Sequence, residues 1–108
     1  MILIVGTIRI APERLAEARP AMQKVIAASR KEAGCLEYVY AEDIQEPGLI
    51  HIMERWASQA AFDEHFVSGH IAEWCGAWKN IGICDRKLSI YGIGEPQAIP
   101  LRAQVNIA

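Results

Sequence analysis

The chain has 108 residues, of which 52% are hydrophobic and 22% are charged, a composition typical of one globular domain and not of a disordered segment. The formal net charge of -2 and the scattered Lys and Arg residues argue against a nucleic-acid-binding surface. Three cysteines without a CxxC pair favour free thiols in a reducing cytoplasm over a disulfide framework or a zinc site.

The first predicted element is a strand at residues 2–10, which is rich in β-branched side chains. Both faces of this strand are apolar over most of its length, so we expect a central strand that is covered on two sides. The segment has no basic leader and reaches Arg9 too early for a signal peptide or a membrane span. We therefore expect a cytoplasmic protein without a membrane partner.

Residues 11–34 change to the helical period, with Pro12 at the first helical position and Gly34 at the end. The apolar stripe of this helix consists of Leu15, Ala18, Met22, Val25, Ile26 and Ser29. Pro20 falls opposite the stripe, where a proline bends a helix around the surface that it covers. We interpret Pro20 as a structural kink.

Two strands, two short helices and a last strand complete the chain. The strands are expected at residues 36–44, 49–56 and about 83–93. Ser58 and Ser68 are the expected N-caps of the helices, because a serine side chain accepts a hydrogen bond from the free N–H groups of a first turn. This order predicts an α+β, ferredoxin-like βαββαβ fold with a four-stranded antiparallel sheet, spanning residues 1–94. Residues 95–108 are expected to form an extended tail.

The helices of such a fold cover only one face of the sheet. We assign Ile50, Ile52 and Trp56 to the covered face, together with Ile4 and Ile8. The opposite face would carry Leu3, Val5, Leu49 and Met53, and an apolar face of this size should not stay in water on a monomer. We therefore predict a homodimer whose two sheets pack face to face, with the tail reaching the partner subunit.

The segment from Glu54 to Trp74 holds the candidate site. Metal binding by His65 and His70 is not expected, because residues five apart lie about 140° apart on an ideal helix and the break at Ser68–Gly69 separates them. His65 follows Phe62 on an apolar stripe and points toward the sheet. It is either a packed residue bonded to backbone or a neutral imidazole in a dry pocket, available as a base or a hydrogen-bond donor.

Glu54 lies on the strand face that the helices should cover. Its carboxylate either reaches water at the strand's end or orients His65 or a ligand. Trp56 and Trp74 either pack in the core or form the floor of a pocket for a flat aromatic ligand. In the second case Phe62 and Tyr38 are the further walls of this substrate pocket.

Residues 32–43 (EAGCLEYVYAED) and 53–74 (MERWASQAAFDEHFVSGHIAEW) resemble the antibiotic biosynthesis monooxygenase superfamily, small dimeric α+β barrels that include quinol monooxygenases. The Glu-x-Trp-x-Ser element at Glu54, Trp56 and Ser58 and the His-x4-His element at His65 and His70 carry the resemblance. It implies oxidation of a small aromatic quinol or polyphenol by O2 without metal, flavin or other cofactor.

Departures from related branches leave alternatives open. Polyketide-modifying members have an asparagine four residues before the tryptophan matched by Trp56 and a tyrosine six after it, where this chain has Ile52 and Phe62. Haem-degrading relatives use an Asn, Trp and His set, and the matching positions are Gly6, His65 and Cys75, so haem breakdown is not expected. Isomerases that degrade autoinducers share the histidine pair, so an isomerase stays open, as does a non-catalytic dimer that binds a small hydrophobic metabolite.

Overall fold

The helices and strands follow the predicted order in the computed structural model, which describes residues 1–102. They are β1 (Ile2–Ile10), a 3-10 helix (Pro12–Arg14), α1 (Leu15–Arg30), β2 (Cys35–Glu42), β3 (Leu49–Trp56), α2 (Gln59–Phe66), α3 (Gly69–Ile81) and β4 (Ile83–Gly92). Residues 103–108, the end of the expected tail, lie outside the described residues.

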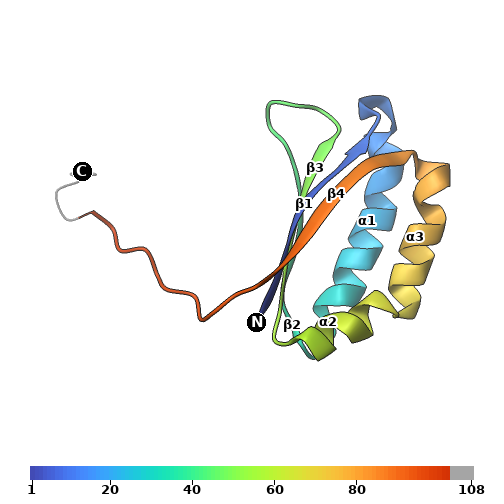
Figure 1. Cartoon of the computed structure of the whole chain (residues 1–108). Coiled ribbons are helices and arrows are strands. Elements are labelled where there is room, and N and C mark those ends of the chain that lie inside the picture. The colour runs from blue at the N-terminus through green and yellow to red at the C-terminus, as the bar shows by residue number, and fades with distance from the viewer. Residues whose placement is uncertain (103–108) are drawn as a thin grey trace.

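The four strands form one antiparallel sheet in the order β2-β3-β1-β4, and the helices lie on one of its faces (Figure 1). This confirms the α+β, ferredoxin-like fold. The period of two in β1 and β3 decides which side chains the helices cover, since alternate residues of a strand point to opposite faces. The residues predicted for the covered face are all buried: Ile4, Ile8, Ile50, Ile52 and Trp56.

The first helix covers the sheet with the predicted stripe. Five of the six stripe residues are buried, and Ile26 is half-buried. The α-helix begins at Leu15, three residues later than Pro12 suggested, because residues 12–14 take the tighter 3-10 form that is frequent at helix starts. Pro20 is exposed on the outer side of the helix, as its position opposite the stripe predicted.

Both predicted serine caps are present, and they determine the direction of the next two helices. Ser58 Oγ accepts a hydrogen bond from the Ala61 N–H at 3.1 Å, and Ser68 Oγ accepts one from the Ile71 N–H at 3.4 Å. Because Ser68 starts a second helix, α2 and α3 do not form one continuous rod (Figure 1). Gly82 then ends α3 in the left-handed conformation, with φ of 75°, and the chain enters β4.

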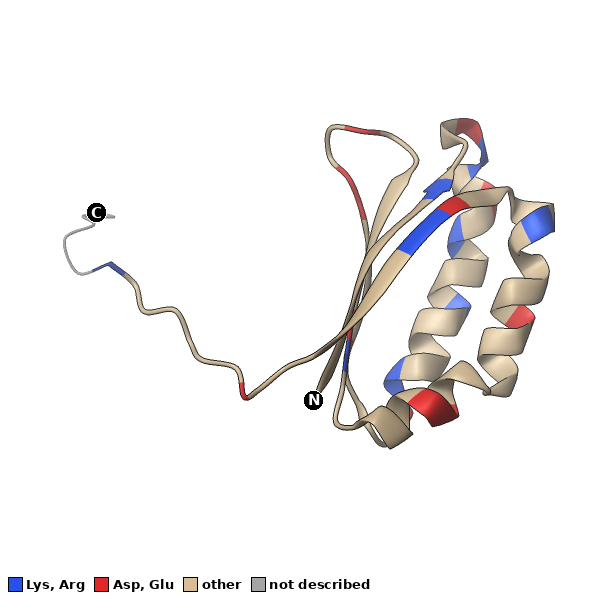
Figure 2. Ribbon diagram, in the orientation of Figure 1, with Lys and Arg blue, Asp and Glu red and all other residues tan. Residues whose placement is uncertain are grey.

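The other face of the sheet is open in the single chain. Leu3, Val5, Leu49 and Met53 on this face are half-buried, so β1 is central but is covered by helices on one side only. Residues 93–102 contain no helix or strand and run away from the sheet (Figure 1). Among the described residues, both charge signs occur on the strands, the helices and the connecting segments (Figure 2). Among residues 1–102, no helix combines the length and apolar character that a membrane crossing requires.

Candidate functional site

A cavity of about 200 Å³ lies between the sheet and the helices α2 and α3. Most of its wall is apolar, and its deepest side chains include Ile4, Ile8 and Ile52 from the sheet. The exposed lining residues come from α2, α3 and β4, so the mouth lies between that edge strand and the helices; they are Phe66, Cys75, Arg86, Ser89 and Ile90. An apolar cavity of about 150 Å³ accepts benzene, so this one has room for a single aromatic ring.

Glu54 places a carboxyl group in the wall of this cavity and is only 5% exposed. The alternation of β3 turns it inward with Ile52 and Trp56, which excludes the alternative that it reaches water. Its Oε1 accepts a hydrogen bond from Trp56 Nε1 at 3.0 Å. Burial nevertheless raises the pKa of Glu54 to about 7, and the hydrogen bond from Trp56 only partly opposes this rise. Glu54 can therefore accept or release a proton near neutral pH.

His65 lies between two carboxyl groups and is 3% exposed. Its Nδ1 is 2.6 Å from Glu32 Oε2, and its Nε2 is 3.7 Å from Glu54 Oε1. Burial lowers the pKa of His65 although the Glu32 carboxylate opposes the change, so the imidazole is neutral at pH 7. A carboxylate can only accept a hydrogen bond, so the ring proton sits on Nδ1 and leaves Nε2 free to accept another. The ring partner is thus a carboxylate and not the backbone.

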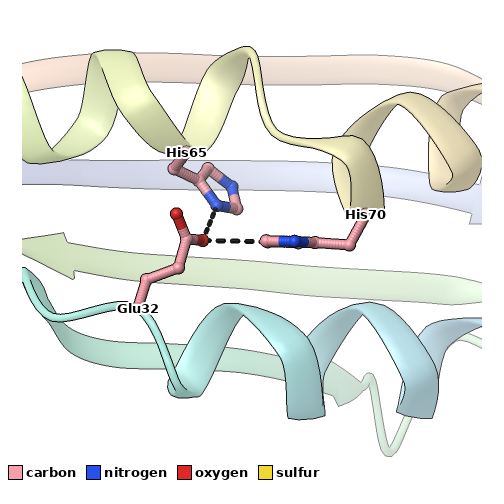
Figure 3. A group of neighbouring side chains, drawn as sticks. All are labelled: Glu32, His65 and His70. Carbon is pink, nitrogen blue, oxygen red and sulfur yellow. Dashed lines mark hydrogen bonds and ion pairs between the residues drawn. The ribbon is translucent and has the colours of Figure 1, made fainter.

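Glu32 also forms a hydrogen bond with His70. Its contacts with the two histidines join α2 and α3 to the end of α1 (Figure 3). The same oxygen, Oε2, lies 2.9 Å from His70 Nε2. The His70 side chain is only 23% exposed and is held by Glu32. The sequence pattern did not identify Glu32, which is 33 residues from His65. The available signal was its place in the segment 32–43 that carries the family resemblance.

Glu32, His65 and His70 are also the described residues that come closest to a metal-ligand set. One ligand atom from each lies within 4.8 Å of the others. Two imidazoles and a carboxylate suit divalent transition metals. The expected angle of about 140° between the histidines applies to one continuous helix, and the start of α3 at Ser68 removes that constraint. In the geometry of Figure 3 the three groups satisfy one another by hydrogen bonds.

The predicted aromatic residues have two different positions. Phe62, Trp74 and Tyr38 line the cavity, as expected of a substrate pocket. Trp56 is 0% exposed and does not belong to the lining; its ring centroid lies 4.4 Å from that of His65. Trp56 therefore supports His65 and Glu54 from behind the cavity wall.

Other lining residues were not singled out from the sequence. Tyr40 shares the inner face of β2 with Tyr38, and the two hydroxyl oxygens are 3.2 Å apart. Burial raises the pKa of both phenols, so they stay protonated and act as hydrogen-bond donors, not as bases. Trp78 follows Trp74 by one helical turn, and this spacing could have indicated that both side chains face the same cavity. Whether the Arg86 side chain faces the cavity depends on the register of β4, and no feature of the neighbouring sequence indicates that register.

Comparisons with known proteins agree with this fold. A family model described as antibiotic biosynthesis monooxygenase matches residues 1–77. An uncharacterized protein of Synechocystis is 30% identical over 98 residues, which cover 91% of this chain and 67% of the relative. A crystal structure from Deinococcus radiodurans, assigned to the antibiotic biosynthesis monooxygenases, has a TM-score of 0.85 and 30% identity, covering 93% of this chain and 99% of the other. Another from Caulobacter crescentus, with a TM-score of 0.80, 22% identity and coverage of 87% and 90%, shares the fold.

Proposed function

Because this chain belongs to the antibiotic biosynthesis monooxygenase family, we propose that it is a cofactor-independent monooxygenase that oxidises a small aromatic quinol or polyphenol with O2. The observation that carries the proposal is that Glu54 and His65 line an apolar cavity while Glu32, which is not part of the lining, pairs with His65. An electron-rich phenolate reacts with O2 more readily than the neutral phenol does. A base that faces an apolar cavity is what the formation of this anion requires.

His65 is the proposed base. Its Nε2 carries no proton while Glu32 holds the Nδ1–H, and the Glu32 carboxylate stabilises the imidazolium that forms when Nε2 takes a phenolic proton. The 3.7 Å between His65 Nε2 and Glu54 Oε1 is too long for a hydrogen bond, so both groups are available to a bound hydroxyl. Glu54 is the proposed second proton carrier, since its pKa of about 7 lets it exchange protons near neutral pH.

The proposed reaction balances without an external reductant. One oxygen atom of O2 enters the ring of the quinol, the other leaves as water, and the ring ends as a hydroxyquinone. The substrate supplies all four electrons that O2 accepts. The cavity volume of about 200 Å³ favours a substrate with one ring, and its apolar wall keeps water from the anion.

The proposed working form is a homodimer that forms through the open face of the sheet. Leu3, Val5 and Met53 place apolar groups on this face, and two-layer packing of sheets would remove them from water. Ile99 and Leu101 are strongly exposed on the extended segment after β4, which supports a contact of the tail with the partner subunit. The free cysteines, Cys35, Cys75 and Cys84, support the proposed cytoplasmic location.

Oxygen uptake with a panel of one-ring quinols tests the proposed activity. We expect His65→Gln to lower the rate by about a hundredfold or more, the usual effect of removing a positioned base. Glu64→Gln is the matched control, because Glu64 is the neighbouring residue on α2 and is exposed. An unchanged rate in His65→Gln would remove His65 from the mechanism. Product formation without oxygen uptake would instead indicate an isomerase, and binding without any product would indicate a metabolite-binding protein.

A further inference from the structure

Arg86 is a cation at the mouth of the cavity with no carboxylate partner among residues 1–102. It belongs to the lining, and its guanidinium carbon lies 5.8 Å from the ring centroid of Trp78. By contrast, Arg9, Arg19 and Arg55 each form an ion pair with a glutamate. The guanidinium is held against the indole ring and keeps its donors available.

Trp78 brings a second donor without an acceptor to the same wall. Its Nε1 is buried and has no hydrogen-bond partner in the part of the chain that the structure describes. A buried N–H group that lacks an acceptor costs free energy, and such groups are rare in native proteins. Trp78 and Arg86 both line the cavity, so an acceptor that enters at the mouth meets the exposed guanidinium first and reaches the buried Trp78 N–H only after a small shift of the indole.

The charges in the cavity favour a negatively charged guest. The guanidinium of Arg86 stays charged over the whole physiological pH range. The only carboxyl group among the described lining residues is Glu54. Burial raises the pKa of Glu54 to about 7, so about half of its negative charge is absent at neutral pH. An anion at the mouth therefore meets one full positive charge, which also attracts Glu54, and about half of one negative charge.

We propose that Arg86 and Trp78 form an anion subsite at the mouth of the cavity, which binds the carboxylate of an aromatic acid whose ring occupies the apolar interior. The planar guanidinium matches a carboxylate in a two-point hydrogen bond, which fixes the ring against Ile4 and Ile52. Arg86 lies beyond residues 1–77, so the family match does not account for it. The role of this acid as the substrate rests on the proposed function. Its binding at Arg86 does not depend on that function.

Anaerobic binding measurements separate this subsite from catalysis. The probes are gentisate, a one-ring quinol with a carboxylate, and gentisamide, its neutral amide, and both are titrated against the quenching of tryptophan fluorescence. We expect the protein to bind gentisate about tenfold more tightly than gentisamide, as a charge-assisted hydrogen bond provides. Arg86→Gln should remove this preference by weakening gentisate about tenfold while gentisamide changes less than twofold.

Lys87→Gln is the matched control, because it removes one positive charge from the next residue of β4, whose side chain is not part of the lining. It should leave both affinities within twofold, and Trp78→Phe, which keeps an aromatic ring but removes the N–H, should weaken gentisate by about threefold. Retained gentisamide binding shows that each variant is folded. Equal affinities for the two probes, no binding of either, or equal losses in Arg86→Gln and Lys87→Gln would overturn the subsite. Tight gentisate binding without oxidation of gentisate or of any other one-ring quinol in air would refute the proposed function alone.

Discussion

Replacing Glu54 by glutamine should stabilise the protein, and the gain should grow with pH. Burial raises the pKa of Glu54 from 4.5 to about 7, so the folded state holds this proton more tightly than the unfolded state does. The corresponding stabilisation is present below pH 4.5 and is lost as the pH rises through 7. Each pKa unit corresponds to about 1.4 kcal/mol, so an ionised Glu54 costs the folded state about 3 kcal/mol at pH 8. Glutamine avoids this cost, and its amide oxygen can still accept the hydrogen bond from Trp56.

Urea unfolding at pH 5 and pH 8, at one fixed protomer concentration, measures the effect. The difference in free energy of unfolding between Glu54→Gln and wild type should be about 2 to 3 kcal/mol more favourable at pH 8 than at pH 5. The control Glu64→Gln, an exposed residue of α2, should change by less than about 0.5 kcal/mol at either pH. A Glu54→Gln difference that does not depend on pH would show that Glu54 ionises normally and would refute the argument from burial.

Three further predictions follow from the contacts. Glu32→Gln should lower the rate of oxidation by about tenfold or more, because an amide fixes the His65 tautomer less strongly than a carboxylate does. An unchanged rate would show that Glu32 does not assist His65. Ser58→Ala and Ser68→Ala should each lower the free energy of unfolding by about 1 kcal/mol in urea unfolding, and unchanged stability would show that the caps contribute nothing. Met53→Glu should convert the proposed dimer into a protomer of 12.0 kDa in light scattering, whereas a wild-type protein already of that size would contradict the sheet-to-sheet interface.

The parts of the fold that depend on neighbouring residues could be predicted from the sequence. The bounds of β1 and β3 are those expected, because alternation and β-branched residues act within each strand. Ser58 and Ser68 were identifiable as caps since a cap bonds to a backbone group only three residues away. The buried face of the sheet followed from the same alternation, and so did the inward position of Glu54.

The partners within the site could not be predicted in the same way. Glu32 meets His65 and His70 only because the end of α1 packs beside the break between α2 and α3. The two histidines lie on separate helices, as the expected cap at Ser68 implied, so their spacing in the sequence could not place their rings relative to one another. The sequence left Trp56 open between core packing and a pocket wall, because both fit a residue on the covered face of the sheet. Its depth in the core, which the sequence does not show, decides for packing.

Isotope labelling of the oxygen atoms tests most directly whether the Glu54–His65–Glu32 cavity carries out an oxygenation. When a one-ring quinol turns over under doubly labelled O2, we expect one labelled atom in the hydroxyquinone and the other in water, with His65→Gln abolishing the labelled product. A quinone product without label, accompanied by hydrogen peroxide, would mean that no oxygen atom is transferred to the ring and would contradict the account.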